Sequence, residues 1–162
     1  MALLATFYEL HLQRRHNEKS LQPIAQIAIT DRGRLLSIHI ENNGVGPLIV
    51  EKLTFTKDGK HYTNIEDCLD LDPRSYQHIS VSESDKKVIL PGSYEEVFSM
   101  EFSEGYTDKE MDSARQQLAT LKLRVDGRNI YQNKVTVERE LQWFIRHQAA
   151  QGVLPEYSER CK

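Results

Sequence analysis

The sequence predicts a mainly β protein: an immunoglobulin-like antiparallel β-sandwich with an N-terminal helix and one or two short internal helices. Three observations support this fold class. From residue 24 onward, about seven short segments alternate apolar and polar side chains, which is typical of half-buried antiparallel strands. Turns rich in glycine, proline or Asp-Gly separate these segments. The regular alternation of strands with long helices that a parallel α/β sheet requires is missing.

The first 16 residues follow a different pattern, in which apolar side chains recur at steps of three and four. This pattern predicts an amphipathic or largely apolar helix over residues 2 to about 16. The apolar stretch ahead of Glu9 is too short to cross a bilayer, which takes about 20 apolar residues. Two interpretations stay open: the last turns of a membrane helix, and a helix packed on the domain or on another copy of the chain. The residues expected to mediate membrane attachment or self-association are Leu3, Leu4, Phe7, Tyr8 and Leu10.

The chain divides into three parts by composition. Residues 1–19 form the N-terminal helix and a linker, residues 20–150 form the β-sandwich domain, and residues 151–162 form a polar tail. Inside the domain, the strongest helix signal covers residues 108–119, because a capping box that begins at Thr107 stands in front of it.

A corner of sequence interrupts the most strand-like region of the chain, and its candidate structural residues are Asn42, Asn43, Gly44, Gly46 and Pro47. The glycine spacing does not fit a phosphate-binding loop, and the β-branched residues that follow predict a strand instead of a helix N-terminus. We therefore expect a structural corner. In it the two glycines take positive φ, the proline fixes its own φ, and the asparagines hydrogen-bond the turn backbone.

Composition and motifs give no support for nucleic-acid binding or catalysis. The formal net charge is −3, from 21 basic and 24 acidic side chains, whereas nucleic-acid binding normally needs a basic excess. The histidines and acidic residues lack metal-ligand spacing, and no nucleophile motif is present. The sequence thus predicts a non-enzyme with no catalytic residue, cofactor or metal. Cys68 and Cys161 are expected to be free thiols, because they belong to no disulfide framework.

Four stretches of the chain resemble a loose group of uncharacterised bacterial proteins: "QRRHNEKSLQP", "IHIENNGVGPLIVEKLTFTKDGK", "VILPGSYEEV" and "LRVDGRNIYQNKVTVERE". Members carry one N-terminal transmembrane helix, a short basic and polar linker, and a β-sandwich domain. Asn-Asn-Gly-x-Gly-Pro is the most specific of the shared motifs. This sequence departs from the group at Leu48, where a small residue is usual, and in having at most a stub of the membrane segment. The resemblance implies an architecture and an attachment, and no activity.

Two functions follow as expectations. The first is a non-enzymatic, membrane-tethered interaction domain that binds a protein partner and self-associates into a homo-oligomer through its N-terminal helix. Because Arg14 and Arg15 follow the apolar stretch, the domain is expected on the cytoplasmic face, with the periplasmic face as the alternative. The second is a soluble ligand-sensing or accessory domain that binds a small molecule near Tyr62, Tyr76 and Tyr106.

Overall fold

The structure, a computed structural model, describes residues 2–146 of the chain. The polar tail predicted over residues 151–162, like the predicted domain end at residue 150, lies outside this range. The two α-helices are α1 (Ala2–Ser20) and α2 (Asp108–Ala119). The strands are β1 (Ala25–Arg32), β2 (Leu35–Asn42), β3 (Leu48–Lys57), β4 (Lys60–Tyr62), β5 (Gln77–His78), β6 (Lys87–Ile89), β7 (Tyr94–Glu101), β8 (Lys122–Arg128) and β9 (Lys134–Glu140). The same described residues also contain three short 3-10 helices: η1 (Ile65–Cys68), η2 (Pro73–Ser75) and η3 (Gln142–Ile145).

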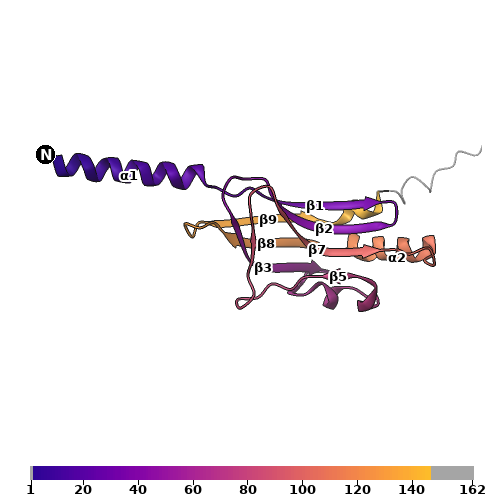
Figure 1. The fold of residues 1–162 in the computed structure, drawn as a ribbon. Coiled ribbons are helices and arrows are strands. Elements are labelled where there is room, and N and C mark those ends of the chain that lie inside the picture. Colours follow the sequence, from indigo (N-terminus) through magenta and orange to yellow (C-terminus); the bar gives the residue numbers. More distant parts are fainter. Residues whose placement is uncertain (1, 147–162) are drawn as a thin grey trace, which may run out of the picture.

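The strands form two sheets (Figure 1). One has the order β1-β2-β7-β5; the other has the order β4-β3-β8-β9, with β6 also paired to β3. Every pairing is antiparallel. The prediction of a mainly β fold with antiparallel sheets, an N-terminal helix and a second helix is therefore confirmed. The finer prediction of an immunoglobulin-like fold stays a prediction.

The core lies between the two sheets and is built by alternation along the strands. In β2, Leu36, Ile38 and Ile40 are buried against the core, because side chains two apart share one face of a strand. Phe55 of β3 and Phe98 of β7 fill the space from opposite sheets and are fully buried. The two sheets thus share one continuous apolar interior.

One end of the sandwich is capped by α2 and η3. The amide of Glu110 donates to Thr107 Oγ1 (3.4 Å) and the amide of Thr107 donates to Glu110 Oε2 (2.7 Å), which makes the predicted capping box. Behind it, Ala114 and Leu118 of α2 and Phe144 of η3 are completely buried. The helix predicted over residues 108–119 is confirmed with the same bounds.

A buried ion pair fixes α2 to the edge of the first sheet. Arg115 of α2 donates to both carboxylate oxygens of Asp31 in β1, at 3.0 and 2.9 Å, and also to Asp112 at 3.0 Å. The Asp31 side chain is only 3% exposed. The hydrogen bonds to Asp31 raise the pKa of Arg115 above its ordinary value, so the guanidinium stays charged in this setting.

Helix α1 extends away from the sandwich (Figure 1) and is four residues longer at its C-terminal end than the sequence predicted. Its large apolar side chains are exposed, so the predicted packing of this helix on the domain is wrong. The prediction of a membrane-associated location, on the cytoplasmic or the periplasmic face, is also wrong. None of the helices within residues 2–146 combines the length and the apolar composition that crossing a bilayer requires. In α1 the apolar residues stop at Leu12, and polar or charged residues fill the rest.

Candidate functional site

The corner between β2 and β3 is organised around one buried asparagine. Asn42 is fully buried, and its side chain makes four hydrogen bonds. Its Oδ1 accepts from the amides of Ile24 (3.2 Å) and Gly44 (3.1 Å). Its Nδ2 donates to the carbonyls of Gly46 (2.8 Å) and Ile89 (3.0 Å). One side chain therefore joins the corner to two other segments, the α1–β1 linker and β6.

Backbone hydrogen bonds complete this contact. The carbonyl of Gln22 accepts from the amides of Val45 (3.1 Å) and Gly46 (3.3 Å), and the carbonyl of Ile24 accepts from the amide of Asn43 (2.8 Å). We call the linker Leu21–Ile24 together with the corner 42–47 the linker clamp. The clamp holds the segment through which α1 joins the sandwich.

The two glycines of the corner are required by close packing. A Cβ atom on Gly46 would lie closer than 3.0 Å to the carbonyl oxygen of Leu21, and one on Gly44 would meet the backbone of Gln22 and Ile24 equally closely. Neither glycine has positive φ, so the conformation predicted for them is wrong. The linker backbone occupies the positions that the Cβ atoms of residues 44 and 46 would take. The sequence around the corner does not indicate that the linker lies there.

The end of the sandwich that holds the linker clamp, here called the open end, carries exposed apolar side chains. At this end β1, β3, β7 and β9 begin and β2 and β8 finish, as the strand pairing requires. The exposed residues there are Leu21, Ile24, Val45, Val88, Leu90, Tyr94 and Ile130, and five of them are between 58% and 64% exposed. Apart from those on α1, the only other large apolar side chain exposed within the described residues is Leu35, at the capped end. Among residues 2–146 no helix covers the open end, whereas α2 and η3 cover the opposite one.

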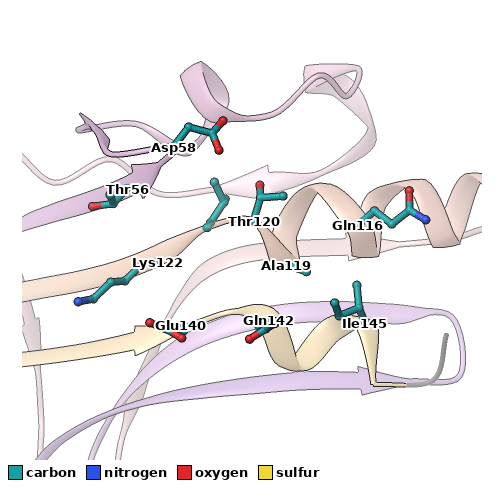
Figure 2. A pocket seen from close by; sticks show the side chains of 10 residues that line it. Thr56, Asp58, Gln116, Ala119, Thr120, Lys122, Glu140, Gln142 and Ile145 are labelled. Carbon is teal, nitrogen blue, oxygen red and sulfur yellow. The ribbon is translucent and has the colours of Figure 1, made fainter. Parts of the chain in front are cut away.

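Two hollows in the described part of the surface bring together no catalytic constellation. One of about 450 Å³ lies at the capped end between the β3–β4 hairpin, α2 and η3 (Figure 2). Its ionisable side chains are Asp58, Lys122 and Glu140, and the ammonium of Lys122 is paired with Glu138. A second, of about 740 Å³, contains Glu51 and Lys86, whose charged groups pair at 3.0 Å. Within residues 2–146 no three His, Cys, Asp or Glu side chains gather closely enough to hold a metal ion.

The three tyrosines predicted to receive a small molecule do not form one site. Tyr76 is buried, and its ring lies 5.2 Å from that of Phe98. The Tyr106 ring meets Phe102 edge-on at 5.3 Å, and Tyr62 packs against the core from β4. Each ring packs against other side chains of the domain. The three tyrosines on which the ligand-sensing prediction depended therefore do not support it.

Several histidine and acidic side chains pair with one another or with the backbone. His39 is partly buried, and its Nε2 lies 3.1 Å from the Glu41 carboxylate. In the acidic group after Thr63, Glu66 pairs with His78 at 3.2 Å and Asp72 accepts from the amide of Arg74 at the start of η2. These contacts orient loops and strand edges.

Cys68 is a buried free thiol, and we expect it to be unreactive in the folded protein. Burial raises its pKa to about 11, so at pH 8 only about one molecule in a thousand carries the thiolate that reacts. In a Cys161→Ser background, a disulfide reagent at pH 8 should leave Cys68 unmodified until denaturant is added. Rapid modification of the folded protein would contradict this assignment.

Comparisons with known proteins give no family for this chain. No family model matches it, and no curated protein matches it. Among solved structures, it is similar to the archaellum periplasmic stator protein FlaG from Sulfolobus acidocaldarius, with a TM-score of 0.28 and 10% sequence identity. The alignment covers 72% of this chain and 100% of that one. A likeness this low supports no inference about what the present chain binds or does.

Proposed function

We propose that this protein is a non-enzymatic interaction domain that binds a protein partner at the open end of its sandwich. The observation that carries this proposal is the distribution of exposed large apolar side chains on the described part of the sandwich, α1 left aside: seven lie at the open end and one, Leu35, lies at the capped end. Exposed apolar residues scattered singly are normal for a protein surface, whereas their concentration in one region is a feature of binding sites.

The energetics favour a partner with an apolar surface of its own. Burying apolar area releases about 25 cal/mol per Å². Val45 and Leu90 sit on turns whose backbone is already ordered, Val45 by the linker clamp and Leu90 by the hydrogen bond from Ser93 to its carbonyl (3.0 Å). Because these turns are ordered before binding, little conformational entropy is lost when a partner covers them.

We also infer that the sandwich is immunoglobulin-like, and the strand orders support this. If β1, β2, β3, β5, β7, β8 and β9 are lettered A to G, the first sheet has the order A-B-E-D and the second contains the order C-F-G, as in constant-type immunoglobulin domains. The short strands β4 and β6 are additional, and both pair with strand C. The B–C and F–G connections then carry Val45 and Ile130 at the open end. Antibody variable domains bind antigen with those same connections; this is an analogy of geometry alone.

Site-specific photo-crosslinking tests the proposal. A photoreactive phenylalanine analogue placed at Val45 or Leu90 should give a discrete crosslinked protein product in the native cells. The same residue placed at Leu35, an apolar position at the capped end, should give none. Identical products from all three positions, or no product from any, would refute binding at the open end.

A further inference from the structure

The first half of α1 is an apolar surface that nothing in the described structure covers. Its exposed side chains are Leu3, Leu4, Phe7, Tyr8, Leu10 and Leu12, with exposures that run from 76% at Leu3 down to 47% at Leu12. Leu12 is nine residues before Leu21, where the linker clamp begins. At 1.5 Å per helical residue, this places the apolar half more than about 13 Å from the clamp. The clamp holds the linker, and in this arrangement all six side chains stay exposed.

Three of these side chains form a seam along the helix. Leu3, Phe7 and Leu10 follow one another at steps of four and three, which is the spacing that aligns side chains against a second helix. The next positions of the same repeat are Arg14 and Asn17, so the apolar seam ends after two turns. A partner helix therefore needs to match only the short stretch from Leu3 to Leu10.

The exposed area of the seam fits a weak dimer that forms at high micromolar concentration. Leu3, Phe7 and Leu10 each expose on the order of 100 Å², so together they offer less than half of the ~800 Å² per partner that a standard interface buries. A second copy of α1 offers the same surface, and a two-fold arrangement lets each copy cover the other.

The charges on the second half of α1 determine the orientation. Arg14, Arg15 and Lys19 outnumber Glu18, so this half is positively charged. Parallel helices would place the two positive halves side by side, where like charges repel. Antiparallel helices that overlap only over residues 3–12 place them at opposite ends of the pair.

We propose that α1 pairs antiparallel with α1 of a second copy, with Phe7 of each copy at the two-fold axis. In this register Leu3 of one copy lies beside Leu10 of its partner. The two sandwiches then stand at opposite ends of the helix pair, with their open ends free. The proposal uses a different surface from the partner site proposed above, so either one can fail without the other.

Disulfide crosslinking tests this register in a Cys161→Ser background, where the remaining native thiol, Cys68, is buried. Under mild oxidation, an equimolar mixture of the Leu3→Cys and Leu10→Cys proteins should form a covalent dimer. Each protein alone should not, because identical positions would be separated by about 9–12 Å along the axis, beyond the ~7 Å that a disulfide tolerates between Cα atoms. Phe7→Cys should crosslink alone, and Ser20→Cys, outside the overlap, should serve as the negative control.

The alternative arrangements give different results, and each would overturn the proposal. Parallel pairing would crosslink Leu3→Cys with itself. Absence of a covalent dimer in the mixture and in Phe7→Cys would exclude helix pairing. Co-sedimentation of the wild-type chain with phosphatidylglycerol vesicles, without any dimer in solution, would assign the apolar surface to lipid instead.

Light scattering supplies a second readout. The wild-type chain should have twice the monomer mass at high micromolar concentration, and Phe7→Glu should have the monomer mass. Gln13→Glu is the matched control, because it adds the same charge to an exposed position outside the seam and should stay dimeric. Both variants should keep the thermal unfolding midpoint of the sandwich, since the helix projects away from it. A monomeric wild-type chain would contradict the proposal.

Discussion

Replacing Arg115 by methionine should lower the free energy of unfolding by about 3–5 kcal/mol, which is the usual cost of removing one member of a buried ion pair. The substitution leaves the Asp31 carboxylate, 3% exposed, without the guanidinium that donates to both of its oxygens. The cost arises mainly from this uncompensated buried charge, because the methionine retains most of the side-chain packing.

Denaturant unfolding monitored by circular dichroism measures this effect. The double variant Asp31→Leu/Arg115→Met should be more stable than Arg115→Met alone, because it removes both charges. Arg124→Met is the control: Arg124 also pairs with acidic side chains, but it is 47% exposed, and its loss should cost less than about 1 kcal/mol. Equal losses for Arg115→Met and Arg124→Met would show that burial of the pair has no influence.

Replacing Gly46 by valine should cost about 3 kcal/mol, at the upper end of what overpacking causes. The new Cβ would overlap the carbonyl of Leu21, and backbone has little freedom to move away. To avoid this overlap, the linker would have to move away from the corner. The bonds from Val45 and Gly46 to the carbonyl of Gln22 would then be lost.

Gly105→Val is the matched control for this prediction, because a Cβ at Gly105 meets open space and the residue does not have positive φ. It should change the unfolding free energy by less than about 1 kcal/mol. Gly46→Ala should already show most of the loss, since the first side-chain atom makes the overlap. A Gly46→Ala protein as stable as the wild type would disprove the close-approach explanation.

The parts of the fold that the sequence predicts are those with local signals. The alternation of Leu36, Ile38 and Ile40 needs only the period of a strand. The capping box at Thr107 needs only four consecutive residues. The ion pair between Asp31 and Arg115 joins residues 84 positions apart, and no pattern within either segment indicates the other.

The candidate site can be predicted only in part, because only some of its features have a local signal in the sequence. The apolar residues of α1 and the corner at Asn42 both stand out in the sequence, but their connection through the linker does not. The sequence indicates that the glycines of the corner are turn residues. The reason that glycine is required there is the backbone of Leu21 and Gln22, which only the fold brings close. At the open end, the sequence feature that could have indicated the surface is the presence of large apolar side chains within turns, as at Val45 and Leu90.

Asn42 also provides a way to identify distant relatives. Its short amide carries two acceptor positions and two donor positions, and all four are used by backbone groups. Aspartate lacks the donors, and glutamine is one methylene too long for the same cavity. Chains that have diverged everywhere else but still tether a helix in this way should keep asparagine at this position and glycine two and four residues later. A sequence search could be restricted to that spacing, between two strands and after a helix. It would group proteins that share the linker clamp, where whole-chain comparison finds no family.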